Sequence, residues 1–225
     1  MTEIGRNISQ LRSEVPANVR IVAVSKFHTV QDIEAAYAAG QRIFGENRAQ
    51  ELCTKAPLLP SDVEWHFLGH LQRNKVRMIM PYVNTIQSID SVELLRLVDA
   101  EAARLGKTVN VLLQLHVAQE ETKTGFAPAE LMMLATDGAF IGMNNVRICG
   151  LMTMASFVDD MEQVRTEFTM AKSVFDTLKS AVFMGNSNFS TLSMGMTGDW
   201  RTAVRCGSTM VRIGTAIFGE RNYQG

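Results

Sequence analysis

Lys26 is the first residue whose position suggests chemistry. It follows the apolar run IVAVS (21–25), whose small and β-branched residues predict a buried strand. A lysine at the end of such a strand either extends its ammonium group to water or is placed at the rim of the core for its amine. Because burial disfavours the charged form of lysine, the second case provides a neutral amine able to form a Schiff base.

Two segments near the C-terminal end of the chain could bind an anion. They are SMGMTGD (193–199) and IGTAIFGE (213–220). Their glycine and hydroxyl residues include Ser193, Gly195, Thr197, Gly214 and Thr215. Glycines let backbone N–H groups close around a phosphate, and hydroxyl groups and a helix N-terminus add further donors. The alternative is that these glycines only form tight turns.

The elements that must position these residues follow one repeated pattern. Short apolar runs rich in Val, Ile and Leu alternate with longer amphipathic stretches. The short runs predict strands at residues 21–25, 42–46, 63–69, 85–89, 110–117, 146–154, 191–196 and 210–215.

The stretches between these strands carry helix signals. Thr29 and Asp90 each precede an acidic residue by three positions, which is the spacing of a capping box. Residues 2–14 predict an extra helix ahead of the first strand, and the longest helix is expected at about residues 159–181. The apolar face of that helix would consist of Met161, Val164, Phe168, Ala171, Phe175 and Leu178.

Eight strand–helix repeats predict the class of fold. In a chain of 225 residues they indicate a single-domain (β/α)8 TIM barrel, an α/β fold, over residues 1–225. The alternative is an open doubly wound sheet, in which strands and helices alternate in the same way. That sheet usually carries the pattern G-x-G-x-x-G after its first strand, whereas IVAVSKFHTV (21–30) contains no glycine. The barrel is therefore favoured, with the N-terminal helix as an addition.

The barrel would bring the candidate residues together. Active sites of such barrels lie at the carboxyl ends of the strands, and the loops after strands 7 and 8 often bind phosphate. Arg212 shares an inward face with Gly214 because side chains alternate along a strand, and a buried arginine needs an acceptor or a ligand. An amine, a phosphate site and a basic partner for a ring nitrogen are what pyridoxal 5′-phosphate (PLP) requires of a protein.

Seven segments at the predicted strand ends carry a family resemblance. They are AVSK (23–26), FGENRAQE (44–51), WHFLGHLQRNK (65–75), TKTGF (122–126), GLMTM (150–154), SMGM (193–196) and GSTMVRIGTAIFGER (207–221). In this order they resemble the pyridoxal phosphate homeostasis proteins, the barrel-only relatives of the alanine racemase N-terminal domain. The resemblance covers nearly the whole chain.

The resemblance implies roles for individual residues. Lys26 would bear PLP as an aldimine, and Arg212 would face the pyridine nitrogen. The other residues expected to bind the cofactor are Ser193, Gly195, Gly214 and Thr215 near the phosphate, and Asn47, His66 and Met194 around the pocket. Lys123 is either a secondary contact of the cofactor or a solvated lysine of the loop. No metal is expected, because WHFLG predicts a strand and no acidic residue has ligand spacing to its histidine.

The resemblance implies binding rather than catalysis. Such a protein would store, buffer or deliver PLP and maintain vitamin B6 and amino-acid homeostasis. The alternative is an amino-acid racemase, which needs a second acid–base group on the opposite face of the ring. In alanine racemases a tyrosine of the partner subunit supplies that group, and a C-terminal domain that is not expected here completes the dimer. A Schiff-base aldolase could use the same lysine and phosphate site, but the family motifs argue against it.

Composition predicts the setting in which the protein works. Hydrophobic residues make up 46% of the chain, and the net charge is −1 without any basic run, which disfavours nucleic acid and anionic membranes as partners. Neither a signal peptide nor a membrane span is expected. The three cysteines are too far apart to suggest a disulfide framework or a zinc site. We expect a cytoplasmic monomer whose partners are PLP and apo-PLP enzymes that receive it.

Overall fold

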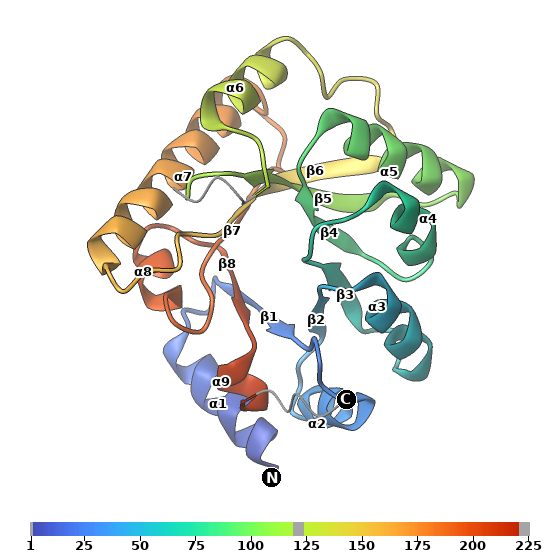
Figure 1. The fold of residues 1–225 in the computed structure, drawn as a ribbon, viewed down its shortest axis with the longest axis vertical. Helices are drawn as coiled ribbons and strands as arrows, with labels where there is room; N and C mark the ends of the chain where they lie inside the picture. The colour runs from blue at the N-terminus through green and yellow to red at the C-terminus, as the bar shows by residue number, and fades with distance from the viewer. Residues whose placement is uncertain (1, 119–123, 221–225) are drawn as a thin grey trace.

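The computed structural model describes residues 2–118 and 124–220, and the eight strands in these ranges close into one parallel barrel (Figure 1). The strands are β1 (Arg20–Val24), β2 (Ile43–Glu46), β3 (Glu64–Phe67), β4 (Thr85–Ile89), β5 (Val109–Leu115), β6 (Val146–Thr153), β7 (Thr191–Ser193) and β8 (Met210–Ile213). Each strand pairs with the next along the chain, and β8 pairs with β1. The predicted (β/α)8 barrel is therefore confirmed, and the open sheet is excluded.

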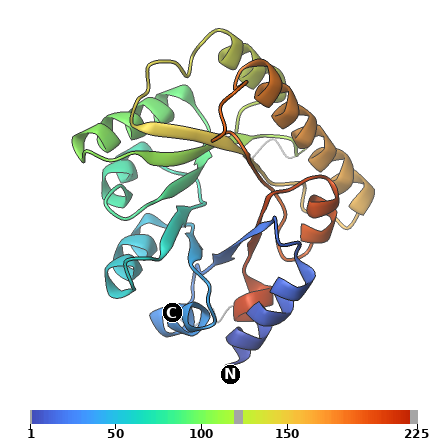
Figure 2. The same cartoon turned by 180° about the vertical axis from the view of Figure 1, so that it is seen from behind.

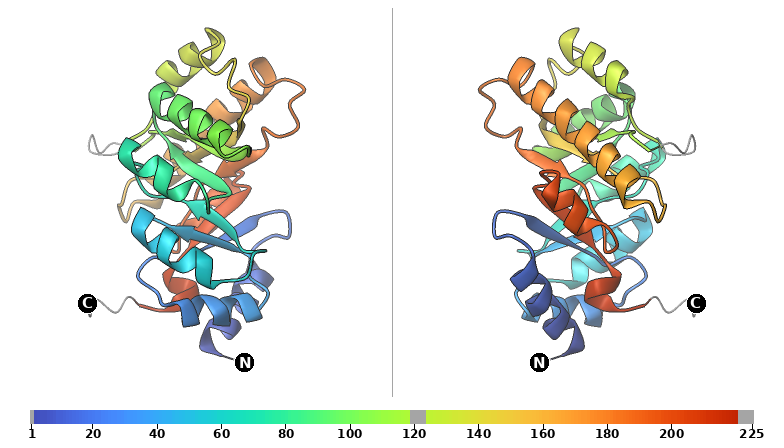
Figure 3. Two further views of the ribbon diagram at one scale, coloured as in Figure 1. Left: turned by 90° about the vertical axis from the view of Figure 1, so that its right-hand side faces the viewer. Right: turned by 90° about the vertical axis from the view of Figure 1, so that its left-hand side faces the viewer.

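The helices form a layer around the barrel, as the views from behind and from both sides show (Figures 2 and 3). They are α1 (Glu3–Glu14), α2 (Val30–Ala38), α3 (Ala49–Lys55), α4 (Val76–Ile79), α5 (Val92–Arg104), α6 (Pro128–Thr136), α7 (Met161–Ala181), α8 (Trp200–Arg205) and α9 (Thr215–Phe218), with short 3₁₀ turns η1 (Ala56–Leu58) and η2 (Arg73–Lys75). The extra helix α1 packs against α2 and α9. None of the helices within the described ranges has the length and apolar character needed to cross a bilayer.

Of the two predicted helix caps, one is confirmed and the other is wrong. Thr29 and Asp32 form the expected capping box at the start of α2. At α5 the predicted cap Asp90 is wrong, because Ser91 has the extended backbone of an N-cap and its hydroxyl accepts the N–H of Leu94 at 3.2 Å. The Asp90 carboxylate instead lies 3.0 Å from the His70 ring.

The core has two parts, on the two faces of the strands. Residues such as Ala23 and Phe44 face outward into a continuous hydrophobic layer between barrel and helices, and their neighbours along the strands face the barrel interior. The predicted apolar face of α7 lies in this outer layer, except for Met161, which is exposed at the first turn. The barrel interior, in contrast, contains several polar side chains, such as Gln87, Ser193 and Arg212.

Strands β7 and β8 are shorter than predicted, and the reason lies in two glycines. Gly195 turns the chain two residues after β7, with φ of +98°, and a Cβ there would lie 2.6 Å from the Cβ of Ala203. Gly214 ends β8 and is the N-cap of α9. Both loops therefore leave the barrel at its carboxyl end, which is where the phosphate-binding segments were predicted.

Candidate functional site

The carboxyl ends of β1 and β8 lie side by side, and this fixes the position of Lys26. Ala23 pairs with Ile213, so Val24 and Gly214 are neighbours at the strand ends. A Cβ on Gly214 would lie 3.5 Å from the carbonyl oxygen of Val24. Lys26 follows two residues later and is half-buried. The segment that carries Lys26 and the start of α9 therefore share one edge of the barrel mouth.

Arg212 carries a positive charge into the barrel interior just below this mouth. The residue is 4% exposed, and its guanidinium donates to the carbonyl oxygen and hydroxyl of Ser193, at 2.9 and 2.8 Å, and to the carbonyl oxygen of Thr153 at 2.8 Å. Burial lowers the pKa of Arg212 to about 10, so the group remains charged near neutral pH. All three acceptors are neutral, and a buried cation held in this way favours a ligand that offers a further acceptor.

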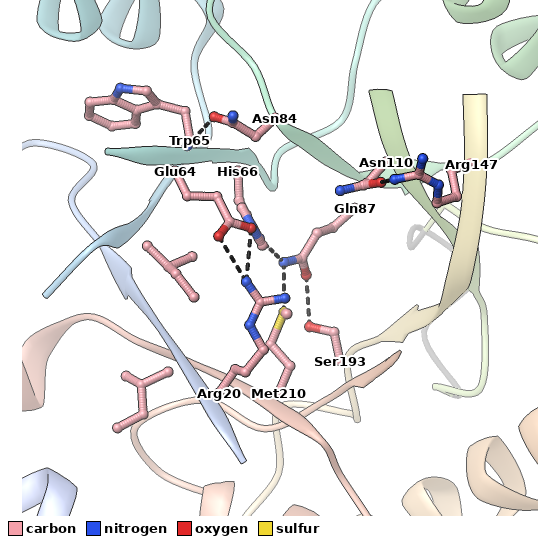
Figure 4. Close-up of polar contacts among 12 residues, drawn as sticks. Arg20, Glu64, Trp65, His66, Asn84, Gln87, Asn110, Arg147, Ser193 and Met210 are labelled. Atoms are coloured by element: carbon pink, nitrogen blue, oxygen red, sulfur yellow. Dashed lines mark hydrogen bonds and ion pairs between the residues drawn. The ribbon is translucent and has the colours of Figure 1, made fainter. Parts of the chain in front are cut away.

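From Ser193, which accepts from this guanidinium, a chain of side chains leads to the opposite end of the barrel (Figure 4). The Ser193 hydroxyl donates to Gln87 Oε1 at 2.7 Å, and Gln87 Nε2 lies 2.7 Å from His66 Nδ1. His66 Nε2 lies 2.9 Å from Glu64 Oε1, and Glu64 forms an ion pair with Arg20 at 2.8 Å. Glu64 and Arg20 are the first residues of their strands, so the chain spans the barrel from its mouth to its amino end.

A second polar network lies outside the barrel and fixes both neighbours of Lys26 in the chain. Lys55 of α3 donates to the carbonyl oxygen of Ser25 at 3.0 Å, to Glu46 Oε1 at 2.9 Å and to Glu51 Oε2 at 2.8 Å. The Ser25 hydroxyl also donates to Glu46, at 2.7 Å. On the other side of Lys26, the N–H of Phe27 donates to Glu51 at 2.8 Å, and this contact holds Phe27 at a φ of +68°.

Sequence reasoning missed this outer network, although one signal was present. Glu46 and Glu51 both lie in the segment FGENRAQE (44–51), and Lys55 stands four residues after Glu51, on the same helix face. The spacing therefore indicates the ion pair on α3. The contact with Ser25 joins two strands, and a single sequence does not show it.

Comparison with known proteins identifies the family. The family model described as "Alanine racemase, N-terminal domain" matches residues 1–222. A pyridoxal phosphate homeostasis protein from Pasteurella multocida is 37% identical, over 99% of this chain and 97% of its own length. The chain belongs to the pyridoxal phosphate homeostasis protein family.

Solved structures agree with this family at the level of the whole fold. The family member PipY of Synechococcus elongatus, solved with PLP bound, has a TM-score of 0.87 and 36% identity, and the likeness covers 96% of this chain and 100% of that one. An alanine racemase from Clostridium difficile has a TM-score of 0.78 at 15% identity, and the match spans 57% of that chain. The second likeness concerns the barrel fold alone.

Two of the residues expected to contact a ligand lie in the barrel interior instead. The Ser193 hydroxyl is fully buried and is engaged by Arg212 and Gln87, so in this structure it supports the guanidinium. His66 is also fully buried, and its ring extends toward Glu64, away from the mouth. The structure therefore does not bring His66 to the edge where Lys26 lies.

Two further residues at the end of β7, Met194 and Gly195, were predicted to bind the cofactor, and they differ in where they lie. Met194 lies in the outer hydrophobic layer, because it alternates with the inward-facing Ser193, so its side chain does not face a ligand in the barrel. Gly195 has a backbone role, since its carbonyl oxygen accepts the N–H of Arg212 at 2.9 Å and ties the loop to β8.

The remaining predicted residues lie at the mouth or beyond the described ranges. Thr215 is exposed in the first turn of α9. Asn47 follows β2 directly and is half-buried, and its carbonyl oxygen lies so close to Gly69 that a Cβ there would be 2.2 Å away. Lys123 lies outside the described residues.

Glu46 is the group whose protonation the outer network alters most. Its carboxyl is fully buried, and Oε2 has no hydrogen-bond partner among the residues that the structure describes. Burial raises the pKa of Glu46 to about 7, although Lys55 and Ser25 act in the opposite direction. The folded protein therefore holds a proton on Glu46 over a pH range in which the unfolded chain has lost it.

We predict that Glu46→Gln changes the pH dependence of stability. In wild type, protonated Glu46 adds to the free energy of unfolding below about pH 4.5, and this contribution is lost as the pH rises to about 7. The variant has no carboxyl group to titrate and shows no such loss. Relative to wild type, the variant should gain about 3 kcal/mol between pH 5 and pH 8, since one pKa unit corresponds to about 1.4 kcal/mol. Urea denaturation at both pH values measures the difference.

Glu101→Gln provides a control of opposite sign. Arg77 and Arg104 lower the pKa of Glu101, so this variant should lose stability relative to wild type as the pH rises toward 4.5. A stability difference between Glu46→Gln and wild type that stays constant from pH 5 to pH 8 would contradict a raised pKa of Glu46.

Proposed function

We propose that this protein binds PLP at the mouth of its barrel, with Lys26 as the amine that holds it. PLP supplies an aldehyde that condenses with a primary amine with loss of water, together with a phosphate group and a pyridine nitrogen. One observation carries the proposal: half-buried Lys26, the buried Arg212 cation and the start of α9 meet at one end of the barrel. The PLP-bound structure of PipY supports it.

The start of α9 suits a phosphate group. Thr215 and Ala216 are exposed and stand in the first turn, whose N–H groups have no acceptor within the helix. Gly214 precedes them without a side chain, so a ligand can approach the backbone there. We assign the phosphate to Gly214 and Thr215, and we assign Ser193 an indirect role through Arg212.

Arg212 decides what the bound ring could do. A guanidinium donates hydrogen bonds and cannot accept them, and this one remains charged near neutral pH. A pyridine nitrogen beside it must therefore act as acceptor and stay unprotonated. An unprotonated ring withdraws electrons weakly, so the site favours holding PLP over stabilising a carbanion.

The alternative function, amino-acid racemisation, lacks support from the tyrosines. Tyr37 lies in the last turn of α2, and its hydroxyl donates at 2.7 Å to Asp62, in the segment that leads from η1 into β3. Tyr82 lies between α4 and β4. Segments that lead from a helix into the next strand lie at the amino end of a barrel, opposite the mouth. Tyr223 lies outside the described residues.

We therefore propose a protein that stores, buffers or delivers PLP and so maintains vitamin B6 and amino-acid homeostasis, with apo-PLP enzymes as recipients. One chain supplies Lys26, Arg212 and the start of α9, so a monomer suffices for binding. The three cysteines are free and half-buried, which suits a reducing cytoplasm.

Lys26 should become covalently labelled. Protein incubated with PLP should turn yellow, and borohydride reduction should leave a pyridoxyl group on the peptide that contains Lys26. Lys107 is an internal control, because burial also lowers its pKa, yet it donates to Met80 and Val83 far from the mouth and should stay unlabelled. Lys26→Ala should lose the covalent product and keep weaker binding. A protein that stays colourless with excess PLP would contradict the proposal.

Delivery can be separated from catalysis in one set of measurements. The PLP-loaded protein should reactivate an apo-PLP enzyme, and L-alanine or L-serine incubated with it should keep its optical purity, because an unprotonated ring is a poor electron sink. Protein without PLP is the control for the first arm. Steady racemisation at about 1 s⁻¹ or faster would favour the racemase instead.

A further inference from the structure

The polar chain inside the barrel has a fixed direction of donors and acceptors. Arg212 donates to the Ser193 hydroxyl at 2.8 Å, and a guanidinium cannot accept in return. The hydroxyl hydrogen of Ser193 must therefore point to Gln87 Oε1, 2.7 Å away. This contact places the carbonyl end of the Gln87 amide toward Ser193 and its NH₂ end on the opposite side.

The NH₂ end of Gln87 then determines the state of His66. Gln87 Nε2 lies 2.7 Å from His66 Nδ1 and 3.2 Å from Met210 Sδ, so the amide donates to both atoms. Because His66 Nδ1 accepts, the ring carries its proton on Nε2, which lies 2.9 Å from Glu64 Oε1. Burial lowers the pKa of His66, and the hydrogen bond from His66 is the largest cause that lowers the pKa of Glu64 to about 2. A neutral imidazole thus donates to a carboxylate.

The reversed arrangement of this chain is unfavourable at every link. A flipped Gln87 amide would direct an N–H group at the Ser193 oxygen and remove the acceptor of the Ser193 hydroxyl hydrogen. Its carbonyl oxygen would then require a proton on His66 Nδ1, and the lone pair of Nε2 would face the Glu64 carboxylate. Arg212 at one end of the chain and Glu64 at the other therefore favour the same orientation of the Gln87 amide.

We propose that Gln87 is a positioning residue for the site, because its oriented amide holds the Ser193 hydroxyl and thereby fixes the Arg212 guanidinium below the mouth. Gln87 is fully buried on β4, and none of the residues expected to bind the cofactor lies on that strand. Its partners come from β3, β7 and β8 (Figure 4). The role of Arg212 toward PLP rests on the proposed function, whereas the fixing of Arg212 by Gln87 does not.

The test uses the protein without PLP and observes Arg212 directly. Side-chain NMR of ¹⁵N-labelled protein, with Arg212 assigned through Arg212→Lys, measures how fast the guanidinium protons exchange with water. Gln87→Met keeps the length of the side chain and removes the amide, and we expect exchange that is faster by up to about tenfold, since one neutral hydrogen bond corresponds to about that factor at most. Ser193→Ala removes the same link from its other end and should have the same effect.

Gln41→Met is the matched control. Gln41 is equally buried and its amide donates to the carbonyl oxygens of Ile21 and Ile43, without contact to Arg212. This variant should leave Arg212 exchange unchanged. Unchanged exchange in Gln87→Met or in Ser193→Ala would overturn the proposal.

A measurement on wild type keeps the proposal falsifiable even if both variants fail to fold. Long-range ¹H–¹⁵N correlation distinguishes the two neutral forms of His66, and a proton on Nδ1 would reverse the Gln87 amide and contradict the proposal. A PLP titration of the same samples separates the two hypotheses. Wild type that binds no PLP would contradict the proposed function, while the exchange data would still decide the role of Gln87.

Discussion

The buried guanidinium of Arg212 is the constraint on which the rest of the site depends. A charge placed among neutral acceptors inside a barrel is costly unless its donors are satisfied, and here the carbonyl oxygens of Ser193 and Thr153 and one hydroxyl satisfy part of them. These acceptors stand at the ends of β6 and β7, so the charge lies directly below the mouth. Closure of the barrel between β8 and β1 then places Lys26 at the same end of the barrel.

Two polar networks on opposite faces of the strands support Arg212 and the two neighbours of Lys26 in the chain. Inside the barrel, the chain from Ser193 to Glu64 determines the orientation of the groups around Arg212. Outside the barrel, Lys55 joins Glu46 and Glu51 and so fixes the residues before and after Lys26. The helix layer thus shapes the mouth as much as the strands do. A half-buried lysine between two fixed neighbours is well suited to hold a reactive aldehyde.

The sequence alone predicted the parts of this arrangement that depend on periodicity. Alternation along β8 placed Arg212 inside the barrel, and the apolar run before Lys26 placed that lysine at a strand end. The same alternation separates Ser193 from Met194, so the assignment of both to one ligand site conflicted with the strand geometry. The strand ends were overestimated where glycines begin turns, because apolar character continues past the last paired residue.

Contacts between distant strands could not be predicted in the same way. Gln87 lies in the predicted strand TIQSI (85–89), next to other polar residues, and nothing in that segment names Ser193 or His66 as its partners. The family resemblance placed His66 around the pocket. Its ring instead extends toward Glu64, two residues earlier on the same face, where the carboxylate accepts a hydrogen bond from His66 Nε2.

The most direct test of this account is the protonation state of the PLP ring nitrogen in the bound protein. PLP labelled with ¹⁵N at this position should show the chemical shift of an unprotonated pyridine nitrogen at every pH from 6 to 9, because in the proposed function the Arg212 cation donates to it. A shift typical of a protonated pyridine nitrogen at pH 7 would show that Arg212 does not face the ring, and would contradict the account.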